Sequence, residues 1–305
     1  MNEKVAVLYG GTSSEREISL MSGRNILNSL LELNINAFLI DTRDYPITQL
    51  KQQKFKKAFI ALHGQNGENG ITQGVLEYLK IPYTGSNVTS TALSIDKLKT
   101  KLLWKACGLP IGSYCYLTYE YFINKKNNKI KEKIKILGLP LIIKPNNQGS
   151  SIGISIIYDY TELNNALRTA FYYDEIVLIE KFIYGKEYSL AILEDNVLPS
   201  ILIAHDRKFY DYEAKYQSNM TQYFCPSRLK IDEEIELKKI IKKAWNTLGC
   251  KHWGRIDVII DPKKKCWLLE VNTCPGMSNN SLMPLAAKSA GISFKELVFR
   301  ILTMV

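Results

Sequence analysis

The sequence predicts an α/β protein (α+β over its whole length) whose N-terminal part is a parallel-sheet domain. Two observations support this fold class. Over residues 1–95, short apolar segments typical of strands alternate with segments typical of helices, which is the pattern of a parallel sheet. Glycine-containing loops also follow two of the predicted strands, at Gly10-Gly11 and at His63-Gly64. Ligands of such sheets bind beyond the carboxyl ends of the strands, so both loops are candidate site elements.

The elements of this first part follow from its apolar runs and from the glycines that end them. Strands are predicted at Lys4–Tyr9, Ala37–Ile40 and Lys57–Leu62. Helices are predicted from about Ser19 to Leu33 and over Thr72–Leu79.

The rest of the chain alternates in a similar way. A helix over Asp96–Cys107 ends at Gly108-Leu109-Pro110, because glycine and proline terminate helices. Residues His205–Arg228 read as irregular, and long loops of this kind are often lids over a site. Further strands are predicted at Ser113–Leu117, Leu141–Pro145, Ile154–Ile157, Ile176–Phe182, Glu187–Leu193, Val197–Ala204, Gly254–Asp261 and Cys266–Asn272. Further helices are predicted at Ile130–Leu137, Thr161–Tyr172, Asp232–Leu248 and, twice, near the C-terminus.

Length and composition describe an ordinary globular chain. Its 305 residues suggest about two domains, or three small ones. The hydrophobic share of 46% and the charged share of 23% exclude a disordered or fibrous chain. No apolar run approaches the roughly 18 residues that a membrane span needs. The run Val5–Leu8 is too short for a signal peptide, so we expect a cytosolic protein with no membrane partner.

The net charge of +10 makes nucleic-acid binding an alternative to consider. Of the 40 basic residues, 8 are Arg and the remaining 32 are Lys. Arg is the residue that suits bidentate phosphate and base contacts, and it is scarce here. We therefore expect no nucleic-acid partner, and a positive field that favours an anionic ligand such as a nucleotide. The six Cys form no CxxC pair, and the three His are scattered, so a zinc site is not indicated.

The two predicted strands near the C-terminus form the most informative pattern. If the two residues Lys263-Lys264 form the hairpin loop, Asp257 faces Glu270 and Arg255 faces Asn272. Side chains alternate along a strand, so all four would share one face.

Two opposed carboxylates repel each other unless a cation lies between them. Mg²⁺ would resolve this, with Asn272 as a third, neutral ligand and Arg255 beside a transferring phosphoryl group. The alternative is that Asp257 and Glu270 form salt bridges with Lys and face solvent.

Three further segments are weaker candidates. The small-residue loop after Lys144, over residues 146–153, could cradle phosphate oxygens or could be a flexible turn. The junction Glu180–Glu187 could offer backbone groups to a purine, although it also reads as an ordinary strand junction. The tyrosine-rich stretch Tyr210–Tyr216 is either part of a lid or a disordered excursion.

Several motifs together resemble one family, the D-alanine–D-alanine ligases of the ATP-grasp superfamily, and the resemblance runs from end to end. The most specific are the runs HGQNGENG at 63–70 and EVNTCPGM at 270–277. The other matching segments are LYGGTSSERE at 8–17, Asp96-Lys97, Lys144 with GSSIG at 149–153, YDYEAKY at 210–216 and GRID at 254–257.

The resemblance implies a three-domain ATP-grasp fold, an N-terminal parallel-sheet domain followed by two ATP-grasp subdomains. It places an N-terminal substrate-binding domain at 1–95, a central subdomain at 96–184, and a C-terminal subdomain at 185–305 with a lid loop at 205–228. The implied reaction joins two D-alanine molecules through a D-alanyl phosphate, for peptidoglycan precursor synthesis, with ATP as cosubstrate. A homodimer is a further family expectation.

The resemblance also implies roles for single residues. ATP would be bound by Lys97, Lys144, Ser151, Glu180, Lys181, Phe182, Ile183, Glu187 and Lys215. Two Mg²⁺ ions, or Mn²⁺ in their place, would be held by Asp257, Glu270 and Asn272. The substrates would be bound by Glu15, His63, Tyr212, Lys215, Tyr216, Arg255, Gly276, Ser281 and Leu282. The residues with implied catalytic roles are Glu15, Ser150, Tyr216, Arg255 and Ser281, of which Ser150, Tyr216 and Glu15 would form one hydrogen-bonded set.

The sequence departs from the family pattern at three positions. Gln148 stands where Glu is common, Cys274 replaces a small Ser, and Asn69 replaces an Asp. None of them removes a predicted metal ligand or phosphate-binding Lys. Two alternatives remain, an ATP-grasp carboxylate–amine or carboxylate–hydroxyl ligase with a different second substrate, and a catalytically silent nucleotide- or nucleic-acid-binding protein.

Overall fold

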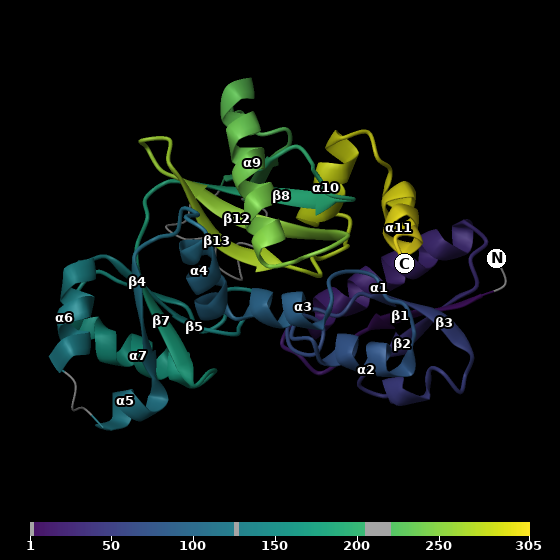
Figure 1. The fold of residues 1–305 in the computed structure, drawn as a ribbon, viewed down its shortest axis with the longest axis horizontal. Coiled ribbons are helices and arrows are strands. Elements are labelled where there is room, and N and C mark those ends of the chain that lie inside the picture. Colours follow the sequence, from purple (N-terminus) through teal and green to yellow (C-terminus); the bar gives the residue numbers. More distant parts are fainter. Residues whose placement is uncertain (1–2, 125–127, 205–220) are drawn as a thin grey trace.

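The computed structural model describes residues 3–124, 128–204 and 221–305, with the backbone alone for residues 128, 129 and 131. Three β-sheets form one after another along the chain, each with its own helices. In Figure 1 the first sheet lies at the right, the second at the left and the third above and between them, and the C-terminal helices return to the N-terminal part. The mixed helix-and-sheet fold predicted from the sequence is confirmed.

The first sheet is parallel, as predicted. Its strands β1 (Lys4–Tyr9), β2 (Ala37–Asp41) and β3 (Phe55–Ile60) lie in the order β2-β1-β3. Helices α1 (Arg16–Glu32) and α2 (Ile71–Leu79) connect and follow them, and a short 3₁₀ turn occupies Ile47–Gln49. The loops after β1 and β3 therefore leave the same edge of the sheet.

Two helices, α3 (Val88–Ile95) and α4 (Lys97–Ala106), lead from the first sheet to the second. Each starts at a side-chain cap, Asn87 for α3 and Asp96 for α4, which satisfies a free N–H of the first turn. The sequence predicted α4 but not α3, because α3 is short and carries no charged face.

The second sheet is antiparallel, in the order β4-β7-β5-β6. Helices α6 and α7 bury apolar side chains against one of its faces. Its strands are β4 (Tyr114–Thr118), β5 (Leu141–Pro145), β6 (Ser155–Ile157) and β7 (Ile176–Lys181). Its helices are α5 (Tyr119–Asn124), α6 (Asn128–Leu137), a 3₁₀ turn at Tyr160–Glu162 and α7 (Leu163–Phe171).

The third sheet is also antiparallel, in the order β11-β10-β8-β12-β13, with β9 paired to β8. Helix α9 packs on one face, and α10 and α11 pack near the other (Figure 1). Its strands are β8 (Lys186–Leu193), β9 (Asn196–Val197), β10 (Ile201–Ala204), β11 (Gln222–Phe224), β12 (Trp253–Ile260) and β13 (Cys266–Asn272). The helices are α9 (Ile231–Thr247), α10 (Leu282–Ser289) and α11 (Phe294–Thr303).

Two predictions about this sheet were wrong. The strand predicted over Val197–Ala204 is divided into β9 and β10, and the interruption contains Pro199, which has no N–H for a sheet ladder. Part of the predicted lid loop, residues 222–224, is strand β11 paired with β10. Residues 205–220 of that loop lie outside the described residues.

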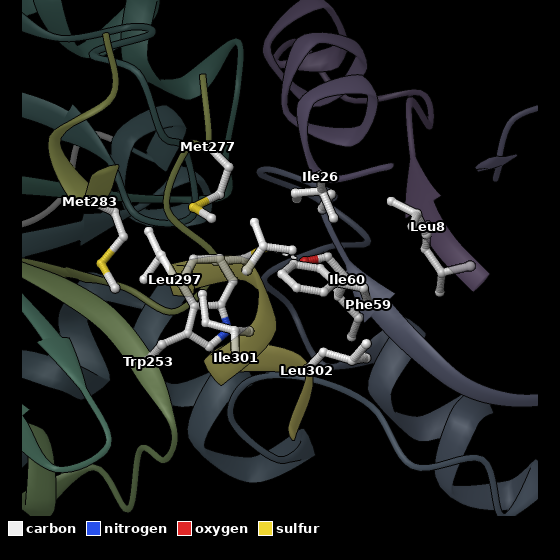
Figure 2. Close-up of a cluster of buried hydrophobic side chains, with 14 of the residues drawn as sticks. Leu8, Ile26, Phe59, Ile60, Trp253, Met277, Met283, Leu297, Ile301 and Leu302 are labelled. Atoms are coloured by element: carbon white, nitrogen blue, oxygen red, sulfur yellow. Dashed lines mark hydrogen bonds between the residues drawn. The ribbon is translucent and has the colours of Figure 1, made fainter. Parts of the chain in front are cut away.

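One apolar core joins the first and last parts of the chain (Figure 2). Phe59 of β3 lies against Trp253 of β12, with ring centroids 6.1 Å apart. Figure 2 shows side chains of α11, among them Leu297 and Ile301, in the same cluster. Each sheet lies within one predicted domain range, and the domain boundaries themselves stay a prediction.

We expect Gly254→Ala to destabilise this arrangement strongly. A Cβ at this position would lie 2.3 Å from Cη2 of Trp245 and 2.9 Å from the backbone oxygen of Asn272. Trp245 is fully buried, so the clash forces a backbone shift, and the free energy of unfolding should fall by about 1–3 kcal/mol. Urea unfolding measures it, with Gly74→Ala as the control, because that Cβ would meet nothing closer than 3.9 Å. Equal midpoints for the two variants would contradict the packing argument.

Candidate active site

The β12–β13 hairpin places its polar side chains as predicted, but through a different loop. Asp257 pairs with Glu270, and Arg255 pairs with Asn272. Nearer the turn the register shifts, with Val258 opposite Leu268, because a bulge adds one residue to β13. The predicted two-residue loop was wrong, since Asp261 already bonds back to Lys265 across three residues. The longer loop and the bulge offset each other, so the polar face is retained.

The face of this sheet away from α9 changes character along its length. At one end Ala191, Leu193 and Trp253 join the core shared with the N-terminal part. Further along, Ser189 of β8 donates a hydrogen bond of 2.7 Å to Asp257. The apolar end therefore anchors the sheet, while the polar end is available for chemistry.

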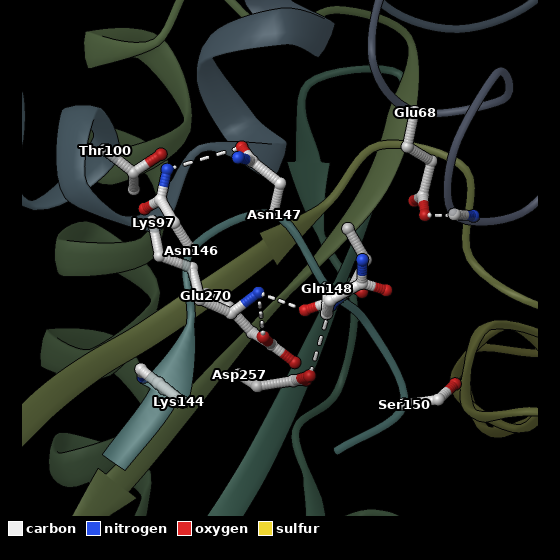
Figure 3. Close-up of polar contacts among 12 residues, drawn as sticks. Glu68, Lys97, Thr100, Lys144, Asn146, Asn147, Gln148, Ser150, Asp257 and Glu270 are labelled. Atoms are coloured by element: carbon white, nitrogen blue, oxygen red, sulfur yellow. Dashed lines mark hydrogen bonds and ion pairs between the residues drawn. The ribbon is translucent and has the colours of Figure 1, made fainter. Parts of the chain in front are cut away.

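Protein cations contact both carboxylates of the hairpin. The Arg255 guanidinium donates to both oxygens of Asp257, at 2.9 and 2.8 Å, and Asn272 Nδ2 donates to the same carboxylate at 3.2 Å. Lys97 of α4 places its Nζ 3.5 Å from Glu270 (Figure 3). The alternative in which both carboxylates form salt bridges and face solvent is thus correct in part. Both carboxylates contact a cation, but Asp257 is 4% exposed and does not face open solvent.

The donor chemistry of this group fits Mg²⁺. Within the described ranges, no three or more His, Cys, Asp or Glu side chains gather as a metal site. The predicted set consists of two carboxylates and the Asn272 amide, whose oxygen stays available because its Nδ2 is the donor to Asp257. Hard oxygen ligands in this number leave room for water and phosphate oxygens, which Mg²⁺ retains.

The loop after β5 lies close to the hairpin. Lys97 Nζ donates to the backbone oxygen of Gln148 at 2.6 Å, and Asn146 Oδ1 accepts from the Leu98 N–H at 2.8 Å, which ties the loop to α4. Ser150 and Ser151 both have positive φ, +50° and +61°. They form the centre of a tight turn, since Ile152 donates its N–H to the Gly149 backbone oxygen at 3.1 Å. Turns of this kind can present backbone N–H groups to an anion.

Strand β7 ends in the residues predicted to meet adenine. Lys181 Nζ donates to the backbone oxygens of Gly138 and Leu139, at 3.1 and 2.6 Å, so its ammonium secures the loop before β5. Phe182 donates its N–H to Pro140 at 3.0 Å, and Ile183 lies close to Gly112. Glu187 follows at the start of β8, where it pairs with Ile259 of β12. The junction thus spans the second and third sheets.

Glu15 connects the N-terminal part to this loop. Ser150 Oγ donates to Glu15 Oε1 in a short hydrogen bond. A Cβ on Gly64 or on Gly149 would lie 2.6 or 2.9 Å from Glu15 Oε2, so both glycines pack closely against this carboxylate. The predicted contact of Glu15 with Ser150 is therefore present. Tyr216, its third predicted member, lies outside the described residues together with Tyr212 and Lys215.

His63 has both ring nitrogens engaged by the protein. Nδ1 lies 2.8 Å from the backbone oxygen of Cys274, and Nε2 lies 3.0 Å from Ser22 Oγ. Because a carbonyl only accepts, Nδ1 carries the proton in this arrangement. Burial lowers the pKa of His63, which keeps the ring neutral. His63 thus positions the turn after β13.

Glu68 is a candidate site residue to which sequence reasoning gave no role. Its carboxyl accepts the Gly64 N–H at 3.0 Å and the Cys274 N–H at 3.1 Å, and so connects the loop after β3 to the turn after β13. Burial, and then the nearby Glu15 carboxylate, raise the pKa of Glu68 to about 8. Its place inside the HGQNGENG run was the available signal.

The turn after β13 leads into α10. Ser281 is the residue before the helix, and its Oγ accepts the Ser278 N–H at 3.0 Å. A Cβ on Gly276 would lie 2.9 Å from the Ser281 Oγ, so these two predicted substrate residues are neighbours. Leu282 is buried at the start of α10, where the first N–H groups have no partner within the helix. Such a helix start suits a carboxylate.

Two family models match the chain. The model described as D-ala D-ala ligase C-terminus matches residues 103–303, and the D-ala D-ala ligase N-terminus model matches residues 45–86. A D-alanine–D-alanine ligase of Buchnera aphidicola subsp. Baizongia pistaciae is 56% identical over 304 residues, which covers 100% of this chain and 98% of that protein. The chain belongs to the D-alanine–D-alanine ligase family. A second ligase of this name, from Buchnera aphidicola subsp. Schizaphis graminum, is 53% identical over 99% of both chains.

Solved structures of two D-alanine ligases share the fold. The enzyme from Bacillus anthracis has a TM-score of 0.87 and 33% identity, covering 99% of this chain and 96% of its own. The same enzyme complexed with ATP has a TM-score of 0.85. The VanG D-Ala:D-Ser ligase from Enterococcus faecalis has a TM-score of 0.87 at 26% identity, covering 100% of this chain and 99% of its own.

A cavity of about 1100 Å³ lies away from the predicted site residues. It is lined mainly by the segment between α4 and β4 and by β4 itself, including Tyr114 and Tyr116, with Trp267 of β13. None of the predicted site residues lines it, so we do not assign it to the reaction. No helix in the described part of the chain is long and apolar enough to cross a membrane.

We expect Asp41→Asn to destabilise the first glycine loop in a pH-dependent way. Arg16 donates to both Asp41 oxygens, at 3.0 and 2.7 Å, and also to the Gly11 backbone oxygen. The Arg16 hydrogen bond lowers the pKa of Asp41 from 3.8 to about 2. This carboxylate therefore contributes stability above about pH 4, and the contribution is lost as the pH falls towards 2. Because the pair is partly exposed, we expect a loss of about 1 kcal/mol at neutral pH.

Urea unfolding of the wild type and of Asp41→Asn measures this difference in the free energy of unfolding. The measurements run from about pH 7 down to about pH 2.5, through the range in which the carboxylate loses its contribution. Asp44→Asn is the matched control, since Asp44 pairs with Arg43 on the exposed surface. A difference between wild type and Asp41→Asn that stays constant over this range would contradict the assignment.

Proposed function

We propose that the chain joins two D-alanine molecules in an ATP-dependent reaction that releases ADP and phosphate and supplies a peptidoglycan precursor. The identity of 56% over essentially the whole length of a D-alanine–D-alanine ligase carries this conclusion. The polar end of the third sheet, the loop after β5 and the Glu15 loop supply the groups that such a reaction needs.

A carboxylate is a poor acyl donor, so the first D-alanine must be activated. Its carboxylate oxygen attacks the γ-phosphate, the bond to ADP breaks, and an acyl phosphate forms. The amine of the second D-alanine then attacks the acyl carbon, loses a proton and expels phosphate. Little covalent work is left for the protein, whose contribution is orientation and charge neutralisation.

The residues around Glu15 would hold the first substrate. Glu15 would accept the substrate ammonium, and Ser150 keeps that carboxylate in place through its hydrogen bond. His63 and Glu68 would act indirectly. Both form hydrogen bonds with the Cys274 backbone and so set the position of Gly276. The Gly276 N–H and Arg255 would stabilise the oxyanion that forms at the acyl carbon.

The nucleotide would lie between the second and third sheets. Lys97 and Lys144 would bind the α- and β-phosphates, and Ser151 would donate from the loop after β5. Adenine would meet Glu180, Lys181, Phe182 and Ile183, and the ribose would meet Glu187. Two Mg²⁺ ions, or Mn²⁺, held by Asp257, Glu270 and Asn272, would supply charge neutralisation at the transferring phosphoryl group.

The second D-alanine would bind at the start of α10. Ser281 and the Leu282 N–H would receive its carboxylate, because the first turn of a helix favours an anion. Tyr216, with Lys215 and Tyr212, is proposed from the family resemblance to complete this part of the site. A homodimer, a cytosolic location and the lack of nucleic-acid and membrane partners stay predictions.

Phosphate release from ATP, measured with and without D-alanine, tests the proposed function. We expect release to depend on D-alanine, with one D-alanyl-D-alanine formed per phosphate and no stimulation by L-alanine. Parallel reactions with D-alanine plus D-serine or D-lactate detect a different second substrate. Stimulation by L-alanine, or a mixed product in preference to the D-alanine dipeptide, would overturn the proposal.

A further inference from the structure

Helix α4 buries a lysine that no step of the proposed reaction uses. Lys101 is 1% exposed, although lysine is almost never fully buried unless it is paired. Its Nζ lies 3.2 Å from Oε1 of Glu180 on β7. Lys144 Nζ, from β5, lies 2.9 Å from the same oxygen. One buried carboxylate is therefore shared between two buried ammonium groups.

The cluster of Lys101, Lys144 and Glu180 carries more positive than negative charge. Two cations surround one anion, Lys97 adds further positive charge from the same helix, and the Tyr114 ring of β4 lies 5.7 Å from Lys101 Nζ. Burial raises the pKa of Glu180, but the ammonium groups of Lys101 and Lys144 outweigh it and hold the pKa below the usual glutamate value. Burial lowers the pKa of Lys101, and Glu180 opposes that shift. Glu180 therefore stays ionised.

The two lysines differ in what else they can reach. Lys144 is on the strand that leads directly into the loop after β5, and the proposed function assigns its ammonium to a phosphate. Lys101 is enclosed between α4 and the second sheet, with almost no accessible surface. If Lys144 turns to a phosphate, Lys101 is the cation that remains on Glu180.

We propose that Lys101 is a positioning residue for nucleotide selection, the permanent counter-ion that keeps Glu180 a pure hydrogen-bond acceptor for a 6-aminopurine. This rests on the proposed function in one respect, that Glu180 meets the purine edge. An ionised carboxylate only accepts, which suits the amino group at C6 of adenine. Hypoxanthine carries a carbonyl at C6, and two acceptors face each other there. A glutamate without Lys101 would be protonated more easily, and a protonated carboxyl can donate to that carbonyl.

The test compares ADP with IDP, which differ at C6 of the purine. Isothermal calorimetry of the full chain with Mg²⁺ measures both dissociation constants and needs no D-alanine. For wild type we expect ADP to bind more tightly by about tenfold or more, the scale of one mismatched buried hydrogen bond. Lys101→Met should compress this ratio about fivefold or more, mainly through weaker ADP binding. Lys101→Arg, which restores a cation, should keep the wild-type ratio.

Lys105→Met is the matched control, because Lys105 lies one turn further along α4 and is exposed. Should Lys101→Met not fold, the double variant Lys101→Met, Glu180→Gln leaves no unpaired buried carboxylate. Its ratio should equal that of Glu180→Gln alone, since Lys101 acts only through Glu180. A separate ratio of kcat/KM for ATP and ITP, with D-alanine present, should shift in parallel.

Three results would overturn the proposal. Wild type binding ADP and IDP equally would show that the purine edge is not read here. Parallel weakening of both nucleotides in Lys101→Met would make Lys101 a structural residue only. If Lys101→Met still changed the ratio of the ADP and IDP dissociation constants in a Glu180→Gln variant, Lys101 would affect nucleotide selection without Glu180. Failure of the ligase activity itself would leave the binding ratios measurable, so the two claims are separable.

Discussion

Glu270→Gln should abolish turnover while leaving the fold intact. The substitution keeps the shape of the side chain in β13 but removes the negative charge opposite Asp257. A neutral amide holds Mg²⁺ poorly, and the transferring phosphoryl group then lacks its main source of charge neutralisation. We expect kcat to fall on the order of 10³-fold, the scale found when a major electrostatic contact of a transition state is lost.

The measurement is D-alanine-dependent phosphate release at saturating Mg²⁺, with thermal unfolding of the same preparation. Glu296→Gln is the control, since Glu296 forms an exposed ion pair with Arg300 on α11. We expect the control to retain wild-type turnover. Turnover of Glu270→Gln within about tenfold of wild type would remove Glu270 from the proposed metal site, because a direct ligand should matter more than an outer partner.

Arg255→Met should have the second largest effect, and it should act on both turnover and stability. Removing the guanidinium takes away the proposed oxyanion donor, which should cost about 10²–10³-fold in kcat. It also removes two hydrogen bonds from the buried Asp257 carboxylate, which retains Ser189 and Asn272. We therefore expect the free energy of unfolding to fall by about 2 kcal/mol, less than for a buried charge left wholly unpaired.

Arg255→Lys separates the two effects. A lysine restores the charge beside Asp257 but not the planar two-point contact, so stability should recover more than turnover. Urea unfolding and steady-state kinetics of both variants provide the comparison, with the exposed Arg43→Met as control. Full recovery of kcat in Arg255→Lys would show that Arg255 acts only as a counter-ion of Asp257.

The polar face of the hairpin was predictable because strand alternation is a local rule. Arg255, Asp257, Glu270 and Asn272 fall on one face for any register in which they pair, and the loop-length error was absorbed by a bulge. The parallel sheet and its two glycine loops were also predictable from local patterns, because their strands and helices follow each other closely in the chain.

Other parts of the site depend on contacts between distant segments. His63 is satisfied by Ser22 and by the Cys274 backbone, 211 residues further along the chain. Lys101 reads as one more solvated lysine of a basic helix until β7 places Glu180 beside it. Residue type and spacing carry no record of such pairings, which arise only when the three sheets pack together.

The most direct test of the central claim follows oxygen from substrate to product. D-alanine labelled with ¹⁸O in both carboxylate oxygens is incubated with the chain, ATP and Mg²⁺, and the released phosphate and dipeptide are analysed by mass spectrometry. If the carboxylate attacks the γ-phosphate and the acyl phosphate is then cleaved by the second amine, each phosphate released carries a single ¹⁸O atom, and the new peptide carbonyl retains the other. Phosphate without ¹⁸O would show that water attacks ATP instead, and the account of this site as one that activates a carboxylate would be wrong.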